Sequence, residues 1–182
     1  EREVSKTSAI LLKEGYESLM HHKALDEYEQ FDSFSIDLEV SHHGPTSLDK
    51  PLIFMELGSG KKQWKIEEAA ELVSRAILDT CFRYLEKQEK KIKVGIGFGG
   101  THYSPQFQKV MRKHKAAVSF ICPKYYIEEL SEQMILQMID HTLENVDLFL
   151  IDWKGTNSAD KKHLLPILER FEGIPWKKIK KL

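Results

Sequence analysis

The spacing of apolar residues along the chain predicts strands that alternate with helices. Between residues 34 and 40, apolar side chains alternate with polar or charged ones, a period of two that is typical of a half-buried strand. From residue 66 to 85, apolar side chains recur every three or four positions, which predicts the clearest amphipathic helix of the chain. Further strands are predicted at 51–57, 92–98, 117–122 and 147–152, and further helices at 6–22, 104–115, 128–144 and 158–173.

Single residues predict where some of these helices begin or bend. Ser104 with Pro105 predicts the start of a short helix, Ser158 can cap the last helix, and Pro166 predicts a kink or restart within it. The acidic stretch at 26–32 is expected to be exposed. Because strands and helices alternate, we expect one α/β domain over residues 1–182, with a mainly parallel sheet covered on both faces.

Composition narrows the class of protein. A chain of 182 residues with 41% hydrophobic residues is long enough for one substantial core. No apolar run approaches the ~20 residues that cross a bilayer, and the first residues do not resemble a signal peptide, so we expect a cytoplasmic protein. Because the chain does not begin with Met, we expect an N-terminal portion to be missing. Cys81 and Cys122 match neither a zinc knuckle nor a disulfide framework and are expected to be buried thiols.

The charge is unevenly distributed, although the formal net charge is only −1. Basic residues cluster from residue 87 to 124 and again at 177–181, while residues 1–32 are rich in acids. Lysine and arginine displace counterions from phosphates, so a polyanionic partner would explain the clustering. A solvated lysine face would explain it equally well, and both interpretations stay open.

Polar side chains follow four of the predicted strands. His42 and His43 end the first strand, Glu56 lies near the end of the second, and a glycine-rich loop with His102 follows the third. Asp152 ends the last. In open α/β sheets ligands bind beyond the carboxyl ends of the strands, so these residues are expected to form one site. The glycines alone could also be a plain strand-to-helix turn.

Three chemical interpretations of this set compete. The spacing Gly95-x-Gly97-x-x-Gly100 matches a dinucleotide fingerprint, but no helix begins within it and no acid lies about 20 residues further on. A second interpretation is a metal site. The three histidines, with Glu56 or Asp152, supply enough nitrogen and oxygen ligands for zinc. However, adjacent histidines on a strand point to opposite faces, unless the Gly-Pro at 44–45 turns the backbone.

The third interpretation is hydrolysis. A histidine would act as general base or orient a water molecule, and amides of the glycine loop would form an oxyanion hole. The sequence has no Gly-x-Ser-x-Gly elbow, which disfavours a serine nucleophile. The remaining histidines lie in helical or charged surroundings and are expected to be structural. Trp176, beside the C-terminal lysines, could contact a base.

Three short motifs resemble those of one known family. Residues 41–46 read Ser-His-His-Gly-Pro-Thr, residues 97–105 read Gly-Phe-Gly-Gly-Thr-His-Tyr-Ser-Pro, and residues 152–155 read Asp-Trp-Lys-Gly. In this order they resemble the archaeal and plant type of D-aminoacyl-tRNA deacylase over most of the chain. The resemblance implies hydrolysis of the ester between a D-amino acid and tRNA, and an association with zinc. It also implies a three-layer α/β/α fold similar to phosphorylase and peptidyl-tRNA hydrolase, and a further N-terminal region.

The residues and the resemblance together predict the site. Catalytic roles are expected for His42, His43 and His102, and zinc ligation for these three with Glu56. The residues expected to bind substrate are Gly97, Gly99, Gly100, Thr101, Tyr103 and Lys154. The expected partner is D-aminoacyl-tRNA, not DNA or a membrane, bound by a monomer. Two alternatives stay open: a zinc-dependent or peptidyl-tRNA-type hydrolase with another substrate, and a non-catalytic tRNA-binding module.

Overall fold

The computed structural model describes residues 3–25, 31, 33–86, 91–113 and 115–182. The acidic stretch at 26–32, apart from its one described residue, therefore lies outside the described residues, as do the charged residues at 87–90 and His114. The described residues form a four-stranded parallel sheet with the strand order β2-β1-β3-β4. Its strands are β1 (Lys93–Phe98), β2 (Ala116–Cys122), β3 (Leu148–Ile151) and β4 (Trp176–Lys178).

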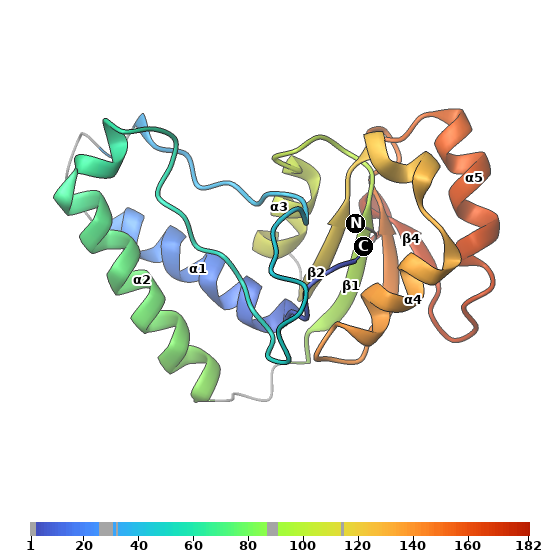
Figure 1. Cartoon of the computed structure of the whole chain (residues 1–182), viewed down its shortest axis with the longest axis horizontal. Coiled ribbons are helices and arrows are strands. Elements are labelled where there is room, and N and C mark those ends of the chain that lie inside the picture. Colours follow the sequence, from blue (N-terminus) through green and yellow to red (C-terminus); the bar gives the residue numbers. More distant parts are fainter. Residues whose placement is uncertain (1–2, 26–30, 32, 87–90, 114) are drawn as a thin grey trace.

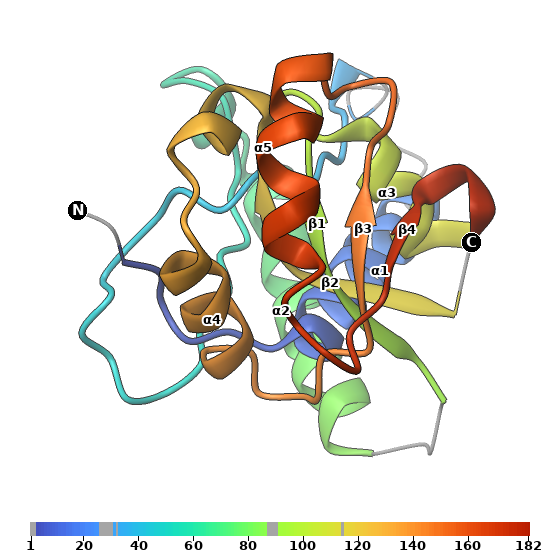
Figure 2. The ribbon, with the colours of Figure 1, turned by 90° about the vertical axis from the view of Figure 1, so that its right-hand side faces the viewer.

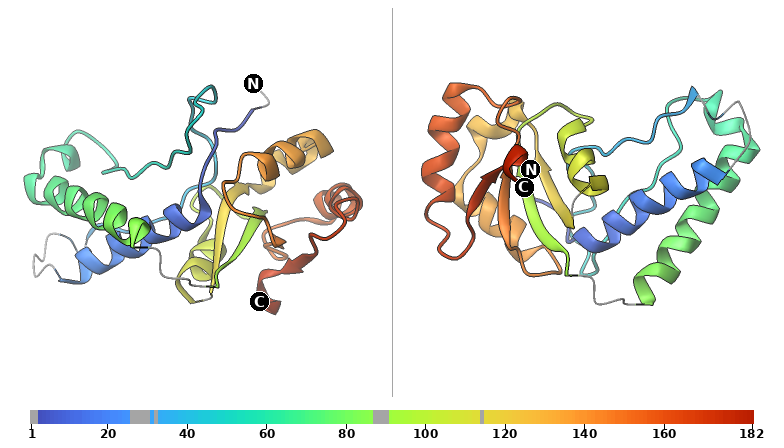
Figure 3. Two further views of the ribbon diagram at one scale, coloured as in Figure 1. Left: turned by 90° about the horizontal axis from the view of Figure 1, so that it is seen from below. Right: turned by 180° about the vertical axis from the view of Figure 1, so that it is seen from behind.

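Helices cover both faces of this sheet, as the sequence predicts (Figures 1 and 2). On one face lie α1 (Ala9–Leu25) and α3 (Pro105–Lys113). On the other lie α4 (Glu132–Asp140) and α5 (Ser158–Leu168). Helix α2 (Glu67–Leu85) packs against α1 on the side away from the sheet (Figures 1 and 3). Short 3₁₀ helices are η2 (Gln63–Lys65), η3 (Lys124–Glu129) and η4 (Ile179–Lys181).

Strand β3 shows how the sequence divides the core between the two faces. Leu148 and Leu150 pack with α1 and α3, whereas Phe149 and Ile151 pack with α4 and α5. Successive side chains of a strand point to opposite faces, so an uninterrupted apolar run is what a sheet covered on both sides requires. All four residues of β3 are buried, and the buried strands hold the loops at their carboxyl ends in fixed positions.

Two predicted strands are not strands. Residues 34–40 and 51–57 are extended, but they join no ladder. The alternation at 34–40 still describes burial, since Leu38 and Val40 are buried and Asp37 is exposed. A period of two reports which side of an extended chain faces the core, but a strand also needs a neighbouring edge to pair with. The two segments run between α2 and the sheet (Figure 1).

The helix boundaries also differ from the prediction. Ser104 does not cap α3 with its side chain, because its hydroxyl donates to the Leu38 carbonyl at 2.7 Å. Helix α5 is capped by Asn157 rather than Ser158, through a capping box with Asp160. It continues through Pro166 and ends at Leu168 rather than near residue 173. The helix predicted at 128–144 is divided into η3 and the shorter α4, and the short strand β4 was not predicted.

Candidate functional site

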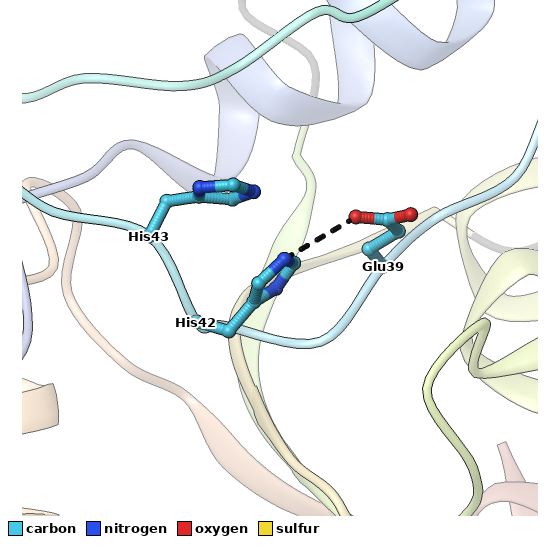
Figure 4. Close-up of side chains that lie close together, drawn as sticks. All are labelled: Glu39, His42 and His43. Atoms are coloured by element: carbon cyan, nitrogen blue, oxygen red, sulfur yellow. Dashed lines mark ion pairs between the residues drawn. The ribbon is translucent and has the colours of Figure 1, made fainter. Parts of the chain in front are cut away.

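Three histidines and a glutamate lie together beyond the carboxyl end of β1. The ring centroids of His42 and His43 are 4.0 Å apart, and those of His42 and His102 are 4.8 Å apart. The carboxylate of Glu39 lies between two of these rings, 3.5 Å from Nε2 of His42 and 3.6 Å from Nε2 of His102. Figure 4 shows Glu39, His42 and His43 converging on one point. The structure thus brings together the three histidines that the sequence singled out.

The backbone around residue 42 explains how two adjacent histidines can share a site. Residues 41–46 are not in a strand, so their side chains need not alternate. The peptide bond between Gly44 and Pro45 is cis. Nδ1 of His42 lies 2.6 Å from the carbonyl oxygen of Val40, which accepts its hydrogen bond. With the hydrogen on Nδ1, Nε2 is the ring nitrogen that faces Glu39.

Hydrogen bonds tie the His42 segment to the sheet. The N–H of Val40 donates to the carbonyl of His102 at 3.0 Å, and the N–H of Ser41 donates to the carbonyl of Ile121 at 3.2 Å. In return, the N–H of Ile121 donates to the hydroxyl of Ser41. These contacts fix His42 relative to β2 and to the loop after β1.

The histidines line a large cavity. It has a volume of about 1890 Å³, and its walls come mainly from the extended segments 33–59. His42, His43 and Tyr103 line it, as does Glu56, whose carboxylate lies 3.6 Å from Nε2 of His43. The three histidine side chains are 34–42% exposed, so solvent and a large substrate can reach them.

The glycine loop supports the site but offers few free amides. Gly97 lies inside β1, against the ring of Phe107. Gly99 donates its N–H to the carbonyl of Cys122 at 2.9 Å, and Gly100 donates to that of Gly155 at 3.1 Å. Both glycines have positive φ, +98° and +81°. The loop therefore joins the ends of β2 and β3, and these two amides cannot form the oxyanion hole that the sequence suggested.

The next amides of the loop differ from these. The N–H groups of Thr101 and His102 donate to no acceptor among the described residues. Thr101 and Tyr103 are exposed, and the ring of Tyr103 meets that of His102 edge-on, with 5.1 Å between centroids. The part of the loop that can contact a ligand is thus 101–103 rather than 97–100.

Residues 152–155, which follow β3, include side chains that hold the turn and one that is exposed. Asp152 accepts a hydrogen bond from the Gly155 N–H at 3.2 Å, which closes the turn beside the glycine loop. Lys154 is exposed. Trp153 stacks on Trp176, with 6.1 Å between ring centroids and 7° between planes, and Lys178 Nζ lies 3.6 Å from the Trp153 centroid. Trp176 is therefore half-buried against another tryptophan.

The remaining histidines have structural partners where they are described. Nδ1 of His141 lies 2.7 Å from the carbonyl of Val4, and Nε2 of His163 lies 2.8 Å from that of Leu130. Nε2 of His22 lies 3.6 Å from Asp79. His21 lies exposed on α1 and does not line the cavity, so it serves as a control position for mutagenesis.

Comparison with known proteins assigns the family. A model of the D-aminoacyl-tRNA deacylase family matches residues 1–176. The chain belongs to the D-aminoacyl-tRNA deacylase family. It is 41% identical over 160 residues to a D-aminoacyl-tRNA deacylase of Methanococcus vannielii, a match that covers 87% of this chain and 60% of the relative. It is 35% identical over 172 residues to one of Methanocaldococcus jannaschii, covering 94% of this chain and 64% of that relative.

The fold of this deacylase family member also has a solved counterpart. A crystal structure of a conserved protein of unknown function matches with a TM-score of 0.84 and 29% identity, over 99% of this chain and 60% of that one. The α/β fold inferred from the sequence is therefore confirmed. In both comparisons the chain spans about 60% of the longer protein. None of the described helices meets the length and hydropathy needed to cross a bilayer.

One residue of the site was missed by sequence analysis. Glu39 contacts both His42 and His102, whereas Glu56, which the sequence placed in the ligand set, contacts His43. Glu39 is a polar residue of the alternating stretch at 34–40, three positions before His42. A carboxylate on the polar side of that stretch, so close to the histidine pair, was the signal that could have found it.

Proposed function

We propose that this chain hydrolyses the ester bond between a D-amino acid and tRNA, releasing the free amino acid and tRNA. The observation that carries the proposal is the cluster of His42, His43 and Glu39 in the wall of a large cavity, with His102 beside them, in a chain of the deacylase family. Small-molecule pockets measure about 300–1,000 Å³. A cavity of about 1890 Å³ can instead admit the end of a macromolecule.

The imidazoles supply the base. An aminoacyl ester is already activated, so one positioned water, one base and donors for the developing oxyanion suffice, without a covalent nucleophile. We assign Nε2 of His42, the ring nitrogen that faces Glu39, as the base: it takes a proton from the water that attacks the ester carbonyl, and returns it to the departing ribose oxygen of tRNA. The Glu39 carboxylate stabilises the positive charge that then develops on the ring. The free N–H groups of Thr101 and His102 are our candidates for the oxyanion donors.

The donor set fits a zinc ion. Glu39, His42 and His43 each offer one ligand atom, and these atoms lie within 4.8 Å of one another. Two nitrogens and a carboxylate oxygen are ligands that zinc accepts, and zinc-bound histidines usually donate their other ring N–H to a carbonyl, as His42 does. His102 and Glu56 are the further candidates that we propose. With zinc bound, His42 would be a ligand rather than the base, and the ion would lower the pKa of a coordinated water molecule.

The proposed substrate contacts come from lysines at the carboxyl end of the sheet and from the glycine loop. Lys124 follows β2, Lys154 follows β3, and Lys178 ends β4, so lysines are available beside the site to contact RNA phosphates. Rejection of L-amino acids requires a fixed wall on one side of the α-carbon. The glycine loop can provide it, because the bonded amides of Gly99 and Gly100 hold it rigid. A cytoplasmic location and a monomeric state stay predictions.

Hydrolysis of D-tyrosyl-tRNA and L-tyrosyl-tRNA, measured side by side with and without EDTA, tests the proposal. We expect turnover of the D-isomer only. The variant His42→Ala should lower kcat/KM for the D-isomer by at least ~100-fold, the range of a lost acid–base group, while the control His21→Ala should not change it. Circular dichroism checks that both variants fold.

The outcomes separate the alternatives. Unchanged deacylation by a folded His42→Ala variant refutes the assignment of the site. Salt-sensitive tRNA binding without turnover of either isomer would indicate a non-catalytic binding module. EDTA-sensitive hydrolysis of peptidyl-tRNA or another ester, with D-tyrosyl-tRNA untouched, would indicate a hydrolase of different specificity.

A further inference from the structure

Two adjacent tyrosines project from the structure next to the proposed active site. Tyr125 and Tyr126 belong to η3, and their residues are 52% and 55% exposed. Their ring centroids are 4.9 Å apart and their planes are inclined by 65°, an edge-to-face arrangement. Two large aromatic rings that stay more than half exposed contribute little to the core, so burial does not account for their presence.

The backbone that carries these rings is firmly held. Ile127, the next residue, is fully buried in the core formed with α4 and α5. The N–H of Tyr126 donates to the carbonyl of Pro123 at 3.1 Å. The N–H of Lys124 donates to the carbonyl of Gly100, also at 3.1 Å. The tyrosines are thus presented on a rigid turn that is bonded to the loop leading to the catalytic histidine.

The same turn is connected to the rest of the histidine cluster. Tyr126 lines the cavity that His42 and His43 also line, and Glu129 at the end of η3 lines it too. Strand β2, which leads into η3, is bonded through Ile121 to the residue before His42. An extended ligand whose ester lies at the histidines can therefore reach the tyrosine rings along one continuous wall.

We propose that Tyr125 and Tyr126 form a stacking platform for the unpaired bases at the 3′ end of the RNA substrate. This inference rests on the proposed function, in which that end carries the scissile ester. Bases of a single-stranded end are unstacked and bind to exposed aromatic faces, whatever their sequence. Lys124, which is exposed beside the rings, adds a charge for the connecting phosphates. The platform positions the ester and recognises the end of the RNA by stacking.

Binding of two uncharged RNAs to the full chain tests the platform. One is a tRNA with its complete 3′ end, and the other is the same tRNA without its three terminal nucleotides. Each base that stacks on an aromatic ring contributes about 5- to 150-fold in affinity. We expect Tyr125→Ala and Tyr126→Ala each to raise the Kd for the complete tRNA by at least ~5-fold and to leave the Kd for the truncated tRNA unchanged.

Three control variants complete the design. Tyr125→Phe and Tyr126→Phe keep the ring and should bind both RNAs like the parent chain. Phe82→Ala removes an aromatic residue of α2 that is 64% exposed and does not line the cavity, and it should change neither Kd. Circular dichroism and urea unfolding verify the fold of each variant.

Two results would overturn the platform. One is an unchanged Kd for the complete tRNA in both alanine variants, and the other is an equal loss of affinity for the complete and the truncated tRNA. Turnover of D-tyrosyl-tRNA by the parent chain is measured in parallel. Turnover with unaffected alanine variants refutes the platform alone, whereas tyrosine-dependent binding without any turnover refutes the proposed function alone.

Discussion

The glycine loop holds the site in place by close packing. Replacing Gly99 by alanine should reveal this packing, because the added methyl group would clash with its neighbours. A Cβ added at Gly99 would lie 2.3 Å from Oγ1 of Thr156 and 3.1 Å from the carbonyl oxygen of Asp152. The Thr156 hydroxyl cannot move freely, because it is buried and donates to that same carbonyl at 2.7 Å. The positive φ of +98° adds a backbone penalty for any side chain.

The control is Gly173, which has a φ of +86° and no atom within 4 Å of an added Cβ. Gly173→Ala should cost only the backbone penalty, about 1–2 kcal/mol. Gly99→Ala should cost in addition about 1–3 kcal/mol for overpacking and about 1 kcal/mol for the displaced Thr156 hydrogen bond. We therefore expect Gly99→Ala to lower the free energy of unfolding by about 2–4 kcal/mol more than Gly173→Ala does.

Urea unfolding followed by circular dichroism measures both variants. The double variant Gly99→Ala/Thr156→Ala removes the closest clashing atom, so it should be less destabilised than the sum of the two single variants. It also keeps the test open if Gly99→Ala alone does not fold. Equal destabilisation by Gly99→Ala and Gly173→Ala, or additivity in the double variant, would refute the packing argument.

Two further predictions follow from ionisable groups. Burial of the Cys122 thiol, followed by the charge of Asp160, raises its pKa to about 12. Iodoacetamide at pH 8 should therefore modify only the exposed Cys81, as counted by mass spectrometry. Labelling of the folded Cys81→Ser variant would contradict this prediction. Partial burial raises the pKa of Asp79, but hydrogen bonds from Ser18 and Arg83 outweigh it and lower the pKa below its ordinary value. The stabilisation by the Asp79 carboxylate is present at neutral pH and is lost as pH falls through the lowered pKa. The difference in unfolding free energy between the parent and Asp79→Asn should therefore shrink below about pH 4. A constant difference in urea unfolding from pH 7 to 3 would refute this prediction.

Periodicity identified most of the fold, because it reports which side of an element is buried. The stretch at 66–85 became α2, and the apolar runs at 92–98 and 117–122 became β1 and β2. The stretch at 34–40 was predicted as a strand because apolar and polar residues alternate along it, and 51–57 was predicted as another strand. Pairing, however, depends on a neighbouring edge that no local pattern encodes. Strand β4 has only three residues, two of them lysines, so its apolar signal is too short to detect.

Part of the site could also be predicted from the sequence. The sequence placed His42 and His102, 60 positions apart, together because both were expected at strand ends. They do lie together, but the segment before His42 is an unpaired extended chain, held by the hydrogen bonds of Val40 and Ser41. Glu39 was not identified, because an alternating acid on a half-buried stretch looks like a solvent-facing residue. The hydrogen bonds of Gly99 and Gly100 depend on the ends of β2 and β3, which are distant in sequence.

The fold separates basic residues that lie close together in the sequence. In the sequence, lysines flank the glycine loop on both sides. In the structure, Lys93 begins β1, and its N–H donates to the carbonyl of Lys115 just before β2. These two lysines therefore lie at the amino-terminal end of the strands, whereas the histidines lie beyond the carboxyl end. Lys124 and Lys154 follow β2 and β3, and Lys178 ends β4, so these three lie at the carboxyl end of the sheet, while Lys23 lines the cavity. Since electrostatic attraction between exposed charges falls off within about 10 Å at 0.1 M salt, we expect the lysines at the carboxyl end of the sheet to contribute more to the proposed binding of tRNA than Lys93 and Lys115 do.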